Sequence, residues 1–318
     1  MKITDQVYGQ ITVNEPVLVE LIQAPAMQRI RGVSQWGIPD EFYQRRGFSR
    51  FDHSVGVMHL LGLVGATVEE QVAGLLHDVS HTAFSHVVDW VIGEGGAEGY
   101  QDEQHERVIS ESVEIVKILE KYGHSVSEIV KYENFTLLEK DAPDICADRV
   151  DYVFREASPS DVQACLSGLI NHQGEMAFST HTTALLFADT FLHRQMSHWG
   201  SFNASIRYRL FADVLKEALE KNLIVFEDFW QDDAFVIRKL RNSKDTSVLE
   251  KLRILREEDL YTFPLSDTVI QKKFRYVDPK LLLDGQLKRL TEVNKDYRDR
   301  LEFCRQQSSE GIPVPQVW

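Results

Sequence analysis

The sequence predicts an all-α protein that begins with a short β-hairpin and ends in a helical C-terminal extension. Apolar residues recur at helical spacing along most of the chain, whereas the run from Gln6 to Val13 has β-branched residues around a glycine, which is typical of two short strands. After residue 159 the sequence shows a helical pattern but few candidate catalytic or metal-binding residues. We therefore expect a catalytic core at 1–160 and a helical part at 161–318 that packs on it without being an independent domain.

Composition limits the classes of function that the chain can have. The 35 basic and 49 acidic residues give a formal net charge of −14, which argues against a broad nucleic-acid surface or an anionic-membrane surface. The three cysteines are widely separated and odd in number, so we expect reduced thiols and a cytoplasmic location. No uncharged apolar run is long enough to predict a membrane span.

Helices are expected in order after the hairpin. One begins at Pro16 and the next at Pro25, because proline is favoured at the first helical position. A third helix runs through Leu63, and after a turn near 65–69 the chain returns in an antiparallel helix. The glycine-rich stretch 93–99 predicts a break before the following helices.

The stretch from residue 75 to 89 holds three histidines and two aspartates among apolar residues. On a helix, the adjacent His77 and Asp78 point about 100° apart, so they converge only on an object between them, such as a metal ion. Imidazole nitrogen together with carboxylate oxygen suits Mn, Fe, Mg, Ni, Co or Zn. A single histidine is more often a hydrogen-bonded core or surface residue, but the group as a whole favours a site.

Further metal ligands are expected from other segments. His53 precedes His77 by 24 residues (77 minus 53), which is enough for two antiparallel helices to bring the two rings together. Another carboxylate is expected near residue 150, where helical periodicity does not choose between Asp148 and Asp151. The alternative for Asp148 is a solvated carboxylate paired with a neighbouring arginine.

These residues resemble the signature of the HD-domain metal-dependent phosphohydrolases, in which a histidine, a His-Asp pair and an aspartate follow one another. The matching residues are His53, His77-Asp78 and Asp148. The stretches 27–35, 49–57, 73–78 with 84–86, and 148–152 resemble the deoxynucleotide triphosphohydrolase branch, which is similar to dGTPases and to proteins that combine a sterile alpha motif with an HD domain. The resemblance implies an HD-domain helical bundle, a divalent metal on those four residues, and a nucleotide substrate. It further implies hydrolysis of a dNTP to deoxynucleoside and triphosphate.

The resemblance also implies roles for residues around the metal. The expected substrate-binding residues are Gln35, Arg50, Arg149, Tyr152 and Glu156, of which the two arginines suit phosphate. The alternative for Gln35 is an ordinary polar residue at a helix end. For proton transfer the first candidate is His81, with Asp89 orienting a neighbouring histidine and with His86 and His105 as the other candidates.

Some features depart from that branch. Ser80 and Thr82-Ala83 stand where it usually has Gly and Gly-Pro, and Glu156 stands where an aspartate lies near the sugar 3′-hydroxyl. The resemblance starts close to Met1, so we expect no N-terminal extension of the kind with which regulated relatives bind activating nucleotides. Two alternatives stay open: a phosphomonoesterase or phosphodiesterase acting on another small phosphoester, and a metal-binding nucleotide sensor without turnover. Members of the branch commonly self-associate, so a homo-oligomer also stays open.

Overall fold

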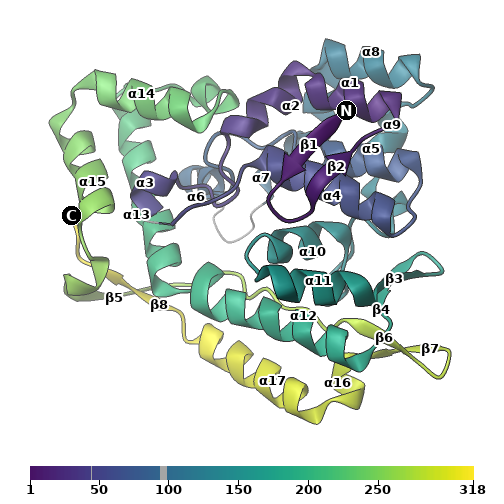
Figure 1. Ribbon diagram of the computed structural model, residues 1–318. Coiled ribbons are helices and arrows are strands. Elements are labelled where there is room, and N and C mark those ends of the chain that lie inside the picture. Colours follow the sequence, from purple (N-terminus) through teal and green to yellow (C-terminus); the bar gives the residue numbers. More distant parts are fainter. Residues whose placement is uncertain (44, 94–98) are drawn as a thin grey trace.

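Figure 1 shows the computed structural model, which describes residues 1–43, 45–93 and 99–318. These residues are predominantly helical and form three small β-sheets. Most of the predicted glycine-rich break at 93–99 lies outside the described residues. Within the described ranges, no helix combines the length and apolar character needed to cross a membrane.

The first half of the chain is a β-hairpin followed by a bundle of helices. The hairpin expected at 6–13 is present, but its antiparallel strands are β1 (Lys2–Asp5) and β2 (Gly9–Thr12). The helices are α1 (Pro16–Gln23), α2 (Pro25–Arg29), η1 (Ile30–Gly32), α3 (Asp40–Tyr43), α4 (Arg50–Leu63), α5 (Val68–Leu76), α6 (Val87–Ile92), α7 (Tyr100–Glu111), α8 (Val113–Lys121), α9 (Val126–Ile129), η2 (Tyr132–Asn134) and α10 (Ala147–Phe154).

The second half is helical but also contains strands β3 to β8, which were not predicted from the sequence. Its elements are α11 (Pro159–Gly168), β3 (Leu169–His172), β4 (Glu175–Phe178), α12 (His181–Arg194), the π-helical turn η3 (Gln195–Trp199), α13 (Phe202–Glu220), η4 (Phe226–Trp230), α14 (Asp233–Ser243), α15 (Thr246–Glu257), η5 (Leu260–Thr262), β5 (Leu265–Ile270), β6 (Lys280–Leu283), β7 (Gln286–Arg289), α16 (Leu290–Val293), α17 (Lys295–Ser309) and β8 (Ile312–Pro315). The sheet order is β3-β4-β6-β7, and β5 pairs with β8. The expected helical extension is therefore confirmed only in part, because strands of four to six residues are too short to give a clear period-two pattern.

Two hydrophobic clusters form the core, and each takes residues from both sides of residue 160. The first packs α1, α4, α5 and α10 with α12 and α17. The second packs α3 and α6 with α13, α14 and α15, which stand at the left of Figure 1. The domain boundary at residue 160 stays a prediction.

The pair α4 and α5 forms the helical hairpin that was expected from the sequence. Helix α4 begins at a capping box, in which Ser49 Oγ accepts from the amide of Asp52 and the Asp52 carboxylate accepts from the amide of Ser49. Gly65 takes a φ of 79° in the turn, a conformation that favours glycine. Thr67 then caps α5 by accepting from the amide of Glu70 at 3.1 Å.

The stretch after α5 is not the continuous helix that was expected. Helix α5 ends at Leu76 and α6 begins only at Val87. Phe84 and Ser85 have φ values of 64° and 47°, which a right-handed helix cannot contain. Asp233 of α14 holds this turn, because its carboxylate accepts from the amide of Phe84 at 2.8 Å. The histidines of 77–86 therefore point in directions set by a turn and not by helical spacing.

Candidate metal centre and active site

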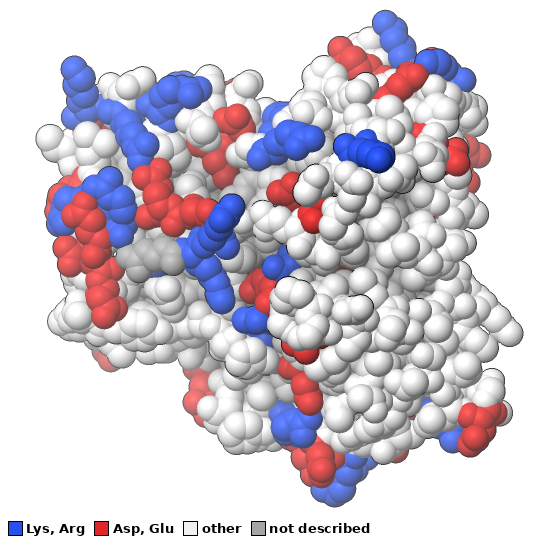
Figure 2. Space-filling model, in the orientation of Figure 1, with Lys and Arg blue, Asp and Glu red and all other residues white. Residues whose placement is uncertain are grey.

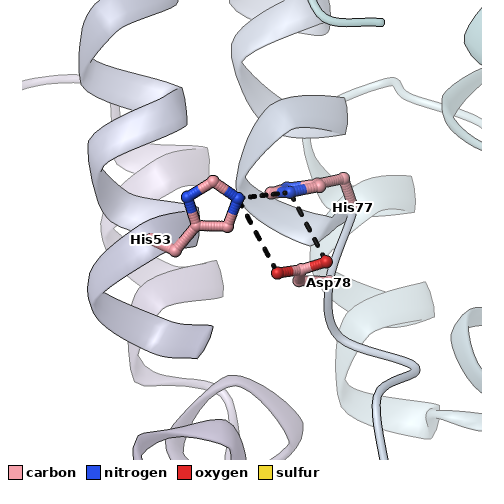
Figure 3. A group of neighbouring side chains, drawn as sticks. All are labelled: His53, His77 and Asp78. Atoms are coloured by element: carbon pink, nitrogen blue, oxygen red, sulfur yellow. Dashed lines mark hydrogen bonds and ion pairs between the residues drawn. The ribbon is translucent and has the colours of Figure 1, made fainter. Parts of the chain in front are cut away.

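The side chains of His53, His77 and Asp78 point toward one another from α4 and from the end of α5 (Figure 3). Nε2 of His53 lies 3.3 Å from Nε2 of His77 and 3.9 Å from Oδ2 of Asp78. Nε2 of His77 lies 3.5 Å from Oδ1 of Asp78. All three residues are buried. Nitrogen and oxygen donors this close together suit a divalent cation.

Asp148 joins this cluster from the first turn of α10. Its Oδ1 lies 2.8 Å from Nε2 of His53 and 3.6 Å from Nε2 of His77. Burial alone would raise the pKa of Asp148, but hydrogen bonds from His53 and His77 hold it below its ordinary value. The carboxylate of Asp148 therefore lies against both histidines that were predicted as metal ligands.

The outer nitrogen of each histidine is fixed by a hydrogen bond. Nδ1 of His77 lies 2.7 Å from the carbonyl oxygen of Gly74, and Nδ1 of His53 lies 2.6 Å from Oδ2 of Asp151. Such bonds turn Nε2 of each ring toward the cluster, as in metal sites whose ligands are oriented from behind. The carboxylate left open by periodicity, Asp151, thus lies behind His53 and not beside the other donors.

Asp151 is itself held by the N-terminal hairpin and by Arg155. The hydroxyl of Tyr8 donates to Oδ1 at 2.8 Å, and Nε of Arg155 donates to Oδ2 at 2.7 Å. Arg155 also contacts Asp5 of β1 at 3.1 Å. Burial lowers the pKa of His53, but its carboxylate partners outweigh this and raise it to about 9. A cation that binds Nε2 therefore has to displace a proton.

The metal cluster forms one wall of a cavity of about 450 Å³. The predicted site residues that line it are Gln35, Arg50, His77, Asp78, His81, His86, Asp148, Arg149, Tyr152 and Glu156. His53 is fully buried behind this wall. Of the remaining predicted residues, Asp89 and His105 are buried and do not line the cavity.

His81 and His86 occupy different environments on the turn after α5. Nε2 of His81 lies 3.3 Å from Oδ1 of Asp78, and the pKa of His81 is well below its ordinary value because burial and the nearby Arg50 disfavour its charged form. The side chain of His86 is 22% exposed and lines the cavity. Its Nδ1 lies 3.3 Å from Oδ2 of Asp89, so Asp89 orients His86 and leaves the other ring nitrogen for a ligand.

His105 lies behind the cavity wall. Its Nδ1 lies 3.2 Å from Oγ of Ser80, and its Nε2 is hydrogen-bonded to the hydroxyl of Tyr132, which does line the cavity. Burial and the neighbouring His77 lower the pKa of His105 to about 4. In this arrangement the hydroxyl of Tyr132, and not the ring of His105, reaches the cavity.

Both arginines predicted to hold phosphate already have partners. NH1 of Arg50 lies 2.9 Å from Oδ2 of Asp78, and its Nε donates to Oγ of Ser85 at 3.0 Å. NH2 of Arg149 lies 3.2 Å from Oε1 of Glu139. These bonds hold the two guanidinium groups at the cavity wall, with part of their hydrogen-bonding capacity already used.

Several cavity residues were missed from the sequence. They are the aromatic residues Trp36, Tyr43 and Tyr208, the π-helical residues His198 and Trp199, and the run Lys272–Tyr276. His198 and Trp199 donate to the carboxylate of Glu156 at 2.6 and 2.7 Å, so both oxygens of Glu156 already have partners. The only signal for the last group was its composition, in which three cations and two aromatic residues stand within five positions of an acidic chain.

Comparison with known proteins agrees with this site. The family model of the HD domain matches residues 50–156. An uncharacterized protein of Bacillus subtilis, YdhJ, is 35% identical over 99% of this chain and 98% of its own length. The metal-dependent phosphohydrolase cns2 of Cordyceps militaris is 32% identical over 89% of this chain and 86% of its own length. A hypothetical protein of Aquifex aeolicus has the same fold, with a TM-score of 0.70 at 21% identity over 94% of this chain and 93% of that one.

The chain belongs to the HD-domain metal-dependent phosphohydrolases. The similarity to the deoxynucleotide triphosphohydrolase branch covers a smaller part of the chain. Human deoxynucleoside triphosphate triphosphohydrolase SAMHD1 is 36% identical over 102 residues, which are 27% of this chain and 16% of that protein. The comparisons therefore establish the phosphohydrolase class and its dependence on a divalent metal.

Proposed function

We propose that this phosphohydrolase cleaves deoxynucleoside triphosphates to deoxynucleoside and intact triphosphate. The observation that carries the proposal is the placement of the metal cluster in the wall of a cavity of about 450 Å³. The rest of its lining includes aromatic rings and the cations Arg149, Lys272, Lys273 and Arg275, beside the acidic Asp102, Glu139 and Glu156. That volume lies within the range of about 300–1,000 Å³ found for small-molecule sites. Aromatic faces suit a base, and cationic side chains suit phosphates.

Gln35 supports a sugar or base contact. Its Oε1 is buried and has no hydrogen-bond partner among the described residues, which is costly unless a ligand supplies one. The backbone oxygen of the same residue accepts from NH2 of Arg50 at 3.3 Å, which ties the predicted sugar contact to the predicted phosphate contact. The partial match to SAMHD1, whose name states this activity, points to the same substrate class.

The residues in the cavity suggest how the bond to the 5′-oxygen is broken. A divalent ion on the four ligands would act as a Lewis acid toward phosphate oxygen and lower the pKa of a water molecule. Arg50, fixed by Asp78, would hold the same phosphate in place. As water attacks the α-phosphorus and the bond to O5′ breaks, His86 would donate the proton that O5′ takes up. We favour His86 over His81 for this step because Asp89 orients it toward the cavity, whereas His81 is bonded to Asp78.

Product analysis tests the proposal. Protein loaded in turn with Mn, Mg, Fe, Co and Ni would be incubated with each dNTP and NTP, and with mono- and cyclic nucleotides, and the products would be separated by chromatography. Asp78→Ala is the control that removes a predicted ligand, and His86→Asn keeps the ligands while removing the proposed proton donor. We expect deoxynucleoside and triphosphate from the wild type, no products from Asp78→Ala, and a much lower kcat with unchanged metal content for His86→Asn.

Other products would change the proposal in defined ways. Orthophosphate or a monophosphate as the only product would indicate a phosphomonoesterase or phosphodiesterase and would refute the dNTP assignment. Binding of metal and nucleotide without turnover for any metal would favour the nucleotide sensor.

A further inference from the structure

The segment 271–279, which we term the strap, connects two separate sheets across the cavity. It leaves β5, which pairs with β8, and enters β6 of the four-stranded sheet. At its far end Val277 is fully buried, and its carbonyl accepts from the hydroxyl of Tyr297 at 2.6 Å. The amide of Asp278 donates to the carbonyl of Pro143 at 2.8 Å. Val277 belongs to the first hydrophobic cluster. At the other end, Ile270 of β5 pairs with Ile312 of β8 and belongs to the second cluster, so both ends of the strap are fixed.

Between these ends, Lys272 to Tyr276 line the same cavity as the metal cluster. Phe274 and Tyr276 stack on each other with ring centroids 5.9 Å apart and pack against the first hydrophobic cluster. Nζ of Lys272 lies 3.8 Å from the ring centroid of Tyr208. Arg275 lines the same cavity as Tyr152, the predicted substrate-binding tyrosine.

The acidic residues that line the cavity, which are Asp78, Asp102, Glu139, Asp148 and Glu156, all lie outside the strap. At the metal wall, Arg50 is paired with Asp78 and Arg149 with Glu139. The strap contributes Lys272, Lys273 and Arg275 within four positions, in a chain whose net charge is −14. Figure 2 shows acidic and basic side chains interspersed over the face it presents, with no broad basic area. The three strap cations line the cavity.

We propose that the strap binds the phosphate groups of the substrate that lie away from the metal cluster, so that the site selects ligands with several phosphates over monophosphates. This inference rests on the proposed function and names the part of the substrate that the second half of the chain recognises. Lysine and arginine form charge-assisted hydrogen bonds with phosphate oxygens. The strap places its three cations on one side of the cavity, and such a local group attracts an anion. The anchored ends keep the cations in place before the ligand arrives, which lowers the entropy lost on binding.

The test measures binding of inorganic orthophosphate and inorganic tripolyphosphate to the metal-loaded protein by calorimetry. The variant Lys273→Gln/Arg275→Gln removes two strap cations, and Lys295→Gln/Arg298→Gln removes the same charge from exposed positions on α17. We expect the strap variant to bind tripolyphosphate about 10- to 100-fold more weakly, because each lost charged contact is worth about tenfold in Kd. Its affinity for orthophosphate, its metal content and its Tm should match those of the wild type. The charge-conserving variant Lys273→Arg/Arg275→Lys should restore most of the tripolyphosphate affinity.

Three results would overturn the inference. The first is a strap variant that binds tripolyphosphate as tightly as the wild type. The second is an equal loss of tripolyphosphate affinity in both double variants. The third is an equal loss of affinity for orthophosphate and for tripolyphosphate in the strap variant. Failure of the proposed function is a separate result: if no dNTP is hydrolysed but the strap variant still loses tripolyphosphate alone, the strap assignment stands and the reaction assignment falls. If dNTPs are hydrolysed and the strap variant binds tripolyphosphate normally, the reaction assignment stands and the strap assignment falls.

Discussion

Replacing Asp151 by asparagine is expected to weaken metal binding although Asp151 is not among the predicted ligands. Its side chain is fully buried, and its Oδ2 lies 2.6 Å from Nδ1 of His53. The carboxylate fixes the ring so that Nε2 faces the cluster, and it increases the basicity of that nitrogen. Asparagine has one carbonyl oxygen for the three donors that Asp151 now accepts from His53, Tyr8 and Arg155.

The size of the effect follows from this geometry. Loss of a partner behind a metal-binding histidine typically costs about 10–100-fold in affinity, which is about 1.4–2.7 kcal/mol. Removal of one partner from an isolated buried ion pair costs about 3–5 kcal/mol of stability. The stability cost here should be smaller, because Arg155 keeps Asp5 at 3.1 Å and the carbonyl of Asp52 at 2.5 Å. The folded variant should therefore be obtainable and its metal affinity measurable.

Competition with a chromophoric chelator would give the affinity, and unfolding in excess chelator would give the stability of the metal-free protein. Asp228→Asn is a matched control, because Asp228 is also buried and accepts from the amide of Val225 at 2.8 Å while pairing with Lys239. It should lose stability and keep its metal affinity. Equal metal affinity in Asp151→Asn and the wild type, with both folded, would refute the proposed orienting role.

Further predictions concern packing, metal removal and pH. A Cβ on Gly56 of α4 would stand 2.0 Å from Oδ1 of Asp151 and 2.1 Å from Arg155. Gly56→Ala should therefore destabilise the protein by about 1–3 kcal/mol and lower its metal affinity, which calorimetric titration measures. Gly62→Ala should change neither property, because its Cβ meets only the end of a flexible glutamine at 3.2 Å. Metal at a hundredfold excess over its Kd should raise the free energy of unfolding by about 2.7 kcal/mol over that of chelator-treated protein, measured by denaturant titration. Burial raises the pKa of Asp233 to about 7, so the folded chain holds a proton there that the unfolded chain releases near its ordinary value of 3.8, and stability should fall as pH rises through this window. This pH-dependent part of the stability is on the order of 4 kcal/mol, and Asp233→Asn should lack it. The free energy of unfolding should therefore differ less between about pH 5 and pH 8 in the variant than in the wild type. An equal pH dependence in both proteins would contradict the assignment.

The metal cluster could be predicted because its parts are local in sequence. His77 and Asp78 are adjacent, and His53 lies on the other arm of one helical hairpin, so spacing alone brings them together. The choice between Asp148 and Asp151 could not be made from periodicity, since both face the same histidine. Tertiary contacts decide it: Asp148 approaches Nε2 and Asp151 approaches Nδ1.

The opposite side of the cavity could not be predicted in the same way. Its strap lies more than a hundred residues after the metal ligands, and it has no regular secondary structure that a pattern could identify. Lys272 acquires its position through the ring of Tyr208, and Phe274 through stacking on Tyr276 and packing on the first cluster. Likewise, a helical pattern could not foresee the turn after α5, which places both His81 and His86 at the cavity.

The cavity lies where the two hydrophobic clusters meet, so each cluster contributes a different part of the site. His53 and Asp148 are carried by helices of the first cluster, while Tyr43 and Tyr208 belong to the second. The strap is fixed to both. Substitutions within the second cluster should therefore change which nucleotide fits without changing metal affinity, because the helices that carry or directly precede the predicted metal ligands, α4, α5 and α10, pack in the first cluster. A change at the strap anchors, by contrast, should alter substrate binding through the relative position of the two clusters.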